Sequence, residues 1–79
     1  MDIYELLLMR ANELYPGKVW LTEENLAVIL EVRPSTIKSY YKRPEDKQPP
    51  RLVIGKEMKF PKERVLEWFV KVQGRGLSV

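Results

Sequence analysis

Small hydroxyl and lysine side chains recur between residues 33 and 43 at the spacing of a helix, in the run RPSTIKSYYKR. At about 100° per residue, one side of such a helix is polar and cationic, and the other is apolar. The polar side holds Ser35, Lys38, Ser39 and Lys42. Small hydroxyls allow close approach, and lysine ammonium groups reach phosphates or base edges in the major groove of DNA. The pattern therefore favours a helix that binds double-stranded DNA, although an ordinary amphipathic surface helix has the same pattern.

Further cations and hydroxyls extend this surface on both sides of the run. The positions expected in the major groove are Ser35, Thr36, Lys38, Ser39, Lys42 and Arg43. The positions expected on the DNA backbone, or on a hairpin beside it, are Arg33, Arg51, Lys56 and Lys59. Because the groove face lacks Asn, Gln and Arg, we expect modest base recognition that depends on lysine–guanine contacts, DNA shape and partner proteins.

The charge of the chain is unevenly distributed. Residues 33–64 contain ten Lys and Arg against four Asp and Glu, a net charge of +6, whereas the remaining segments carry −3. A cationic block between acidic ends is the pattern expected of a nucleic-acid surface. A basic surface that is merely solvated has the same composition, so charge alone leaves both interpretations open.

The composition argues against an enzyme. The chain has no Cys and no His, which removes disulfides, thiolate metal sites and the commonest general base. Glu23 and Glu24 fit the start of a helix, and Glu45 and Asp46 fit a solvated loop. With 79 residues there is little room for a substrate pocket. We therefore expect a protein with no catalytic activity, no metal and no cofactor.

The chain also lacks the features of a membrane or exported protein. Its longest apolar run, residues 26–30, is far shorter than the ~20 residues of a membrane-spanning helix. The N-terminus lacks the basic start of a signal peptide. We expect a cytoplasmic protein with no membrane partner.

These side chains need a scaffold, and the apolar periodicity predicts one domain over residues 1–72, mainly α-helical with a small β-hairpin. A short strand is also possible at residues 19–21. The expected elements are a helix at 2–15, two helices joined by a turn at 22–43, a hairpin at 51–60, a last helix at 62–72 and a flexible tail at 73–79.

Local signals mark the ends of these elements. Thr22 suits the N-cap of the first paired helix, and Pro34 suits the first position of the second, where a missing N–H costs nothing. Pro44 disfavours helical geometry in the residue before it, so that helix should end near Arg43. Gly55 suits the turn between the two strands.

The run WLTEENLAVILEVRPSTIKSYY, followed by PPRLVIGKEMKFPKERVLEWF, combines features in an order typical of one family. A hydrophobic residue and Thr begin the first helix, Ala lies within it, and Val follows at the turn. Ser and Thr open the second helix, prolines precede a hairpin with a central Gly and an aromatic residue, and Trp lies in the closing helix. The positions are Leu21-Thr22, Ala27, Val32, Ser35-Thr36, Pro49-Pro50, Gly55, Phe60 and Trp68. Over about two thirds of its length, the chain resembles the winged helix-turn-helix of phage and plasmid excisionases and related small regulators of the MerR superfamily.

The resemblance implies a winged helix-turn-helix with an extra N-terminal helix. It implies a double-stranded DNA-binding protein, either an excisionase-like recombination directionality factor or a small transcriptional regulator. An integrase, a recombinase or another DNA-bound protein would be its partner. Two features depart from the family pattern, because Glu31 occupies a turn position usually filled by Gly and the loop at 44–50 is longer than usual.

A second interpretation is a protein-interaction module that uses the same fold, as in a phage packaging or replication accessory protein. Apolar residues outside the main helix faces would then form the contact surface, including self-association through the N-terminal helix. These residues are Leu6, Met9, Leu66 and Val70.

Overall fold

The computed structural model describes residues 2–73. Its first helix, α1, spans Ile3–Leu14 and begins at Asp2, whose Oδ1 accepts a hydrogen bond from the Glu5 N–H at 2.8 Å. The helix expected at 2–15 therefore exists, shortened by one residue at each end. The turn that follows contains Gly17 with φ of +75°, a conformation that glycine adopts without strain.

The second helix, α2, spans Glu23–Leu30 and begins where the sequence predicts. The Thr22 hydroxyl accepts the Asn25 N–H, and the Asn25 side-chain oxygen accepts the Thr22 N–H, both at 3.1 Å. This capping box satisfies two N–H groups that have no partner inside the helix. The short strand β1, Trp20–Leu21, precedes Thr22 and lies in contact with α2.

The turn after α2 depends on Glu31, which adopts the left-handed conformation with φ of 56° and ψ of 43°. Glycine takes this conformation more easily, because a Cβ atom crowds the following carbonyl oxygen. Arg10 of α1 supports the turn, since its Nη2 lies 3.4 Å from Glu31 Oε1 and 3.5 Å from Val28 O. The unusual residue is thus accommodated, with a contact from the N-terminal helix.

The third helix, α3, is shorter than the sequence predicts. Its α-helical part covers Pro34–Ser39, and a 3-10 turn, η1, continues through Tyr40–Lys42. Arg43 is extended, as expected before Pro44. The following loop contains a second 3-10 turn, η2, at Glu45–Lys47.

Three short strands form an antiparallel sheet in the order β1-β3-β2. Strands β2, Leu52–Ile54, and β3, Glu57–Pro61, form the expected hairpin. Gly55 has φ of +65°, and Lys56 is not among the residues with positive φ, which fits a type II′ turn. Strand β1 adds to β3 through Leu21 opposite Phe60, a pairing that the sequence did not predict.

The last helix, α4, spans Lys62–Trp68 and continues as a π-helical turn, η3, at Phe69–Gln73. The sequence predicts one regular helix at 62–72, so this irregular final turn is a correction. It also includes Gln73, the first residue of the expected tail at 73–79, and the remainder of that tail lies outside the described residues.

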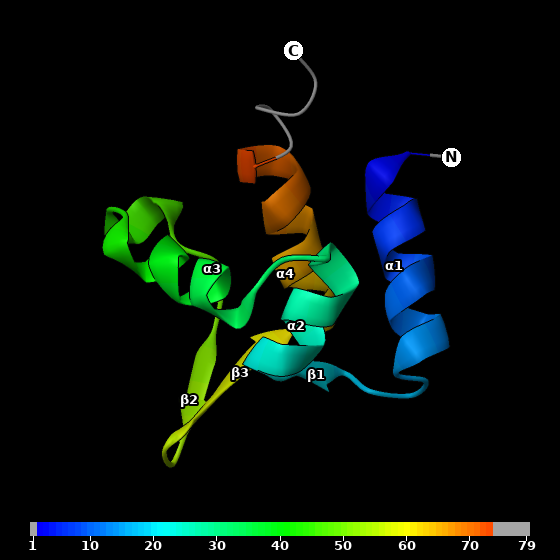
Figure 1. Cartoon of the computed structure of the whole chain (residues 1–79), viewed down its shortest axis with the longest axis horizontal. Coiled ribbons are helices and arrows are strands. Elements are labelled where there is room, and N and C mark those ends of the chain that lie inside the picture. The colour runs from blue at the N-terminus through cyan, green and yellow to red at the C-terminus, as the bar shows by residue number, and fades with distance from the viewer. Residues whose placement is uncertain (1, 74–79) are drawn as a thin grey trace.

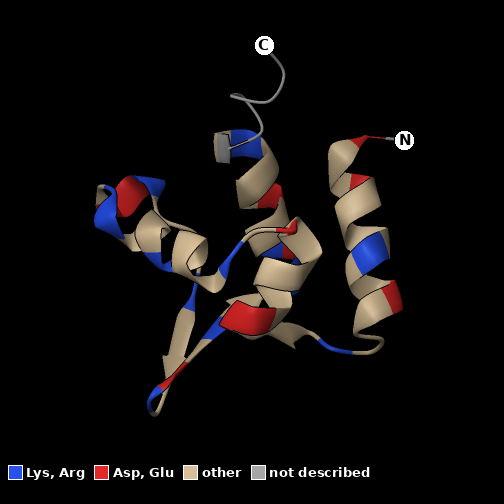
Figure 2. Ribbon diagram, viewed as in Figure 1, with Lys and Arg blue, Asp and Glu red and all other residues tan. Residues whose placement is uncertain are grey.

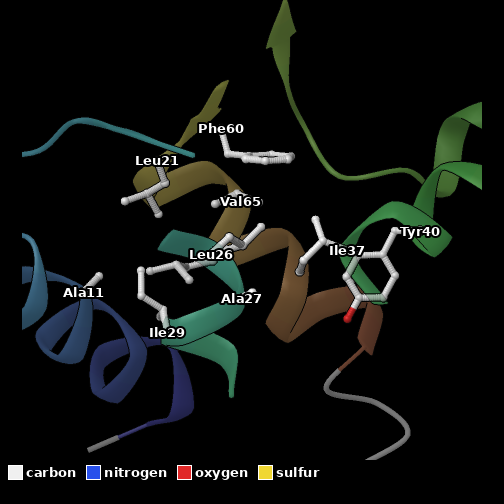
Figure 3. Packing of buried hydrophobic residues seen from close by; sticks show 10 residues of the cluster. Ala11, Leu21, Leu26, Ala27, Ile29, Ile37, Tyr40, Phe60 and Val65 are labelled. Atoms are coloured by element: carbon white, nitrogen blue, oxygen red, sulfur yellow. The ribbon is translucent and has the colours of Figure 1, made fainter. Parts of the chain in front are cut away.

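The core forms where α1, β1, α2, α3, β3 and α4 meet (Figure 3). Its buried side chains are Ala11, Leu21, Leu26, Ala27, Ile29, Ile37, Tyr40, Phe60, Val65 and Leu66. Leu66 is completely buried, so it is not available to the contact surface of the second interpretation. It packs inward because α4 lies between α1 and the sheet.

The described residues form a mainly α domain with four α-helices and a three-stranded antiparallel sheet. Helix α1 packs on α2 and α4, whereas α3 packs on α2. In Figure 1, α1 lies on one side of α2 and α4, and α3 and the β2–β3 hairpin lie on the other side. None of the helices in residues 2–73 is both long and apolar enough to cross a membrane.

Candidate nucleic-acid interface

Helix α3 is anchored on one side and open on the other. Ile37 and Tyr40 point into the core (Figure 3), where their side chains are 0% and 3% exposed. The opposite side presents the four residues grouped by the helical projection, Ser35, Lys38, Ser39 and Lys42, all exposed. The two marginal groove positions, Thr36 and Arg43, are half-buried. The outer surface of α3 is therefore polar and cationic, as its sequence pattern indicates.

The polar groups on this surface differ in how far they are already engaged. Lys38 Nζ lies 3.8 Å from Glu23 Oε1, a long ion pair in which 71% of the lysine side chain is exposed. The Ser39 hydroxyl donates a hydrogen bond to Thr36 O at 2.6 Å. Lys42 is exposed, and within residues 2–73 it forms no ion pair. Lys42 is consequently the cation on this surface that is most available to a ligand.

Two arginines beside α3 are held over aromatic rings. The Arg51 guanidinium lies 4.2 Å from the centre of the Tyr41 ring, and Arg43 lies 5.0 Å from that of Tyr40. Such contacts orient the guanidinium planes while leaving the charge in place. Gln48 connects the same region, since its side-chain amide donates to Tyr41 O at 3.2 Å and to Arg43 O at 2.9 Å.

Tyr41 lies in η1, directly after α3, and contacts both Phe60 of the hairpin and Arg51. Its ring stacks on Phe60 with centroids 6.4 Å apart, and its hydroxyl is buried without a hydrogen-bond partner in the described chain. The pKa of Tyr41 is raised to about 12, mainly by burial, while the Arg51 charge lowers it and the Glu23 charge raises it. The ring therefore stays neutral and acts as a platform for Arg51.

The hairpin carries fewer available cations than its sequence suggests. Lys59 Nζ lies 3.0 Å from Glu57 Oε2, and only 25% of the lysine side chain is exposed. Lys56 is exposed at the turn. Arg33, the remaining expected backbone contact, is exposed at the N-cap of α3 rather than on the hairpin.

Acidic side chains also enter this region. A shallow hollow between the start of α2, α3 and the hairpin is lined by Thr22, Glu23, Glu24, Lys38, Lys56, Glu57, Met58 and Lys59. Its three glutamates balance its three lysines. Figure 2 shows the acidic start of α2 beside basic segments of the hairpin. The sequence marks Glu23 and Glu24 only as helix-start residues, since their closeness to the hairpin depends on the tertiary fold.

The expected site residues lie on the side of the molecule that α3 and the hairpin form, away from α1 (Figures 1 and 2). No protein-family model matches the chain, and no curated protein or solved structure shows significant similarity to it.

Proposed function

We propose that this chain is a non-enzymatic protein that binds double-stranded DNA through a winged helix-turn-helix. In this proposal α2 and α3 are the paired helices, α3 enters the major groove, and the β2–β3 hairpin is the wing. The observation that carries the proposal is the orientation of α3. Ile37 and Tyr40 hold it on the core, so that its polar and cationic side remains exposed beside basic residues of the hairpin.

The residues divide into base-edge and backbone contacts. Ser35 allows close approach at the start of α3, and Lys38 and Lys42 extend toward guanine edges or phosphates. Arg51, oriented by Tyr41, and Lys56, at the hairpin turn, are suited to phosphate contacts. A groove face of two serines and two lysines supports affinity more than strict sequence choice, so DNA shape contributes to recognition.

The biological role that fits best is that of an excisionase-like recombination directionality factor or a small transcriptional regulator. This part of the proposal is supported by the resemblance of residues 20–69 to those proteins. Modest base recognition fits such a role, because these proteins load cooperatively on repeated sites beside a DNA-bound partner. An integrase or another recombinase is the partner we propose.

The groove assignment can be tested by mobility-shift titrations on a duplex chosen by binding-site selection from random DNA. Lys38→Ala and Lys42→Ala should each weaken binding by about 1–3 kcal/mol if they contact bases. If they contact phosphates, the salt dependence of binding should become shallower. Lys18→Ala is the matched control, because it removes the same charge from the turn after α1. Unchanged affinity in both α3 variants would refute the assignment.

The wing can be tested separately with Lys56→Glu. Since a phosphate contact carries no sequence information, this substitution should weaken binding to all duplexes by a similar factor. An effect confined to one sequence would contradict a backbone role for Lys56.

A second candidate function is a protein-interaction module, favoured by one observation on α1. Ile3, Leu6 and Met9 are exposed at three-residue spacing, which places them along one side of the helix. We propose that self-association would use this surface, without Leu66, which is buried. Light scattering of the wild type and Leu6→Glu tests it. A salt-insensitive oligomer that Leu6→Glu dissociates, with no DNA affinity, would favour this function over DNA binding.

A further inference from the structure

Strand β2 has an unusual surface for the outermost strand of a sheet. Leu52, Val53 and Ile54 are consecutive, apolar and exposed, at 45%, 56% and 56%. β2 lies at the edge of the sheet and has no second neighbour in residues 2–73. Figure 1 shows the hairpin projecting from the helices. An uncovered apolar edge strand is a template for a further strand.

The register of the hairpin identifies which backbone groups are open. Ile54 lies opposite Glu57, and Val53 lies opposite Met58. In a hairpin closed by a two-residue turn, the pair flanking the turn exchanges its N–H and C=O bonds, and bonded pairs then alternate. The backbone groups of Leu52 and Ile54 therefore face β3, whereas the N–H and C=O groups of Val53 face the open edge.

Cations lie on both sides of the apolar residues. Arg51 precedes β2 and is oriented by the Tyr41 ring, and Lys56 follows it in the turn. Residues 51–56 contain no acidic residue. The open edge therefore combines backbone hydrogen-bonding groups, three apolar side chains and a positive charge at each end.

We propose that the β2 edge binds an extended segment of a partner protein, in which about three apolar residues are flanked by Asp or Glu, as a fourth strand. The charge at the two ends decides against a second copy of this chain. Antiparallel self-pairing centred on Val53 would gather two copies of Arg51 and Lys56 without an acid on either strand. An acidic-flanked peptide instead pairs with both cations.

This inference does not rest on DNA binding, but the two ligands share Arg51 and Lys56. An acidic segment on β2 would therefore compete with phosphates for the hairpin and leave the α3 surface free. A DNA-binding defect caused by Lys42→Ala concerns only the proposed function, and a peptide-binding defect caused by changes at Val53 concerns only the β2 edge.

The test uses the full chain and two synthetic peptides with the same apolar centre, Asp-Glu-Val-Ile-Val-Glu-Asp and Lys-Arg-Val-Ile-Val-Arg-Lys. Binding is followed by fluorescence anisotropy of labelled peptide and by amide NMR of the protein. The acidic peptide should bind about tenfold more tightly than the basic one, because only the acidic peptide can form exposed ion pairs with Arg51 and Lys56. It should also shift the Val53 amide signal and slow its hydrogen exchange. Equal affinities, or no binding of either peptide, would overturn the proposal.

Variants at Val53 and at the two flanking cations make the test specific. Val53→Pro removes the outward N–H but takes no donor from the β2–β3 pairing, so it should abolish peptide binding while Val53→Thr retains it. The double variant Arg51→Glu/Lys56→Glu should reverse the preference toward the basic peptide, which keeps the test informative even if Val53→Pro fails to fold. A dimer of the wild type that Val53→Pro dissociates would overturn the proposal in favour of a second copy. Loss of duplex binding in Val53→Pro, with no peptide binding by the wild type, would overturn it in favour of DNA.

Discussion

The outer surface of α3 and the β2–β3 hairpin have similar cationic sequences but present their charges differently. On α3, Lys42 is exposed and has no ion-pair partner in the described chain, and Lys38 has only a long one. On the hairpin, Lys59 is paired with Glu57, whereas Lys56 is exposed at the turn. A count of charges along a sequence therefore does not measure the charge available to a ligand.

The difference follows from the geometry of the two elements. A helix places residues three and four apart on one face, so its apolar residues can all face the core while its polar residues face solvent. A strand alternates its side chains between two faces. On β3 this directs Phe60 inward and places Glu57 and Lys59 two residues apart on the same face, where their charges pair.

The largest expected effect tests how the hairpin is attached. Phe60 is completely buried between the sheet and the helices, so Phe60→Ala should lower the free energy of unfolding by about 3–5 kcal/mol. Val53→Ala, on the exposed strand of the same hairpin, should change it by less than about 0.5 kcal/mol. Urea denaturation of the two variants makes the measurement. Similar losses would contradict the view that β3 is anchored and β2 is open.

A second effect compares two residues with positive φ, one in the turn before α3 and one in the turn of the hairpin. Glu31 and Gly55 both have positive φ, and at Gly55 an added Cβ would meet no atom within 4 Å. Glu31→Gly should therefore be more stable than Glu31→Ala by about 1 kcal/mol, and Gly55→Ala should be less stable than the wild type by about 1 kcal/mol. Both Glu31 variants lose the Arg10 contact, so it cancels in their comparison. Thermal denaturation measures each difference, and equal stability of the two Glu31 variants would argue against strain at this turn.

A smaller effect should appear if the paired lysine of the hairpin is released. Glu57→Gln removes the partner of Lys59, which makes its charge available to phosphates. On the proposed function, the affinity for duplex DNA should rise by about 0.5–1 kcal/mol, and more so at low salt. Glu13→Gln, on α1, changes the net charge equally and serves as the control in the same titration. A similar gain in both variants would show that only total charge matters.

The last expected effect appears only at high pH and concerns Tyr41, the contact shared by α3 and the hairpin. Because burial raises its pKa to about 12, the folded state favours the neutral ring more than the unfolded chain does. The contribution of this pKa difference to the free energy of unfolding is fully present below about pH 10. It is lost as the pH rises through 10 toward 12. Absorbance titration of the four tyrosines should show an ionisation near pH 12 that Tyr41→Phe removes. Ionisation of all tyrosines near pH 10 would show that Tyr41 is not buried in this way.

Much of the fold was predictable because its signals act over a few residues. Thr22 begins α2 and Pro34 begins α3, since each satisfies or avoids a local hydrogen-bonding requirement. Gly55 marks the hairpin turn for the same kind of reason. The less regular ends were missed, because no capping or turn signal in the sequence marks the 3-10 turn after Ser39 or the π-helical turn after Trp68. Tyr40 and Trp68, which lie at these two ends, are distant in sequence and pack together with ring centroids 5.3 Å apart.

The sequence by itself determined where the elements begin, which side of α3 faces outward and where the hairpin turns. Helical caps, turn conformations and side-chain periodicity all arise within one or two turns of the chain. Only the tertiary structure decided that β1 joins β3 and that Glu23 lies beside Lys38. Strand pairing and charge pairing at these positions depend on segments distant in sequence, so no local pattern specifies them.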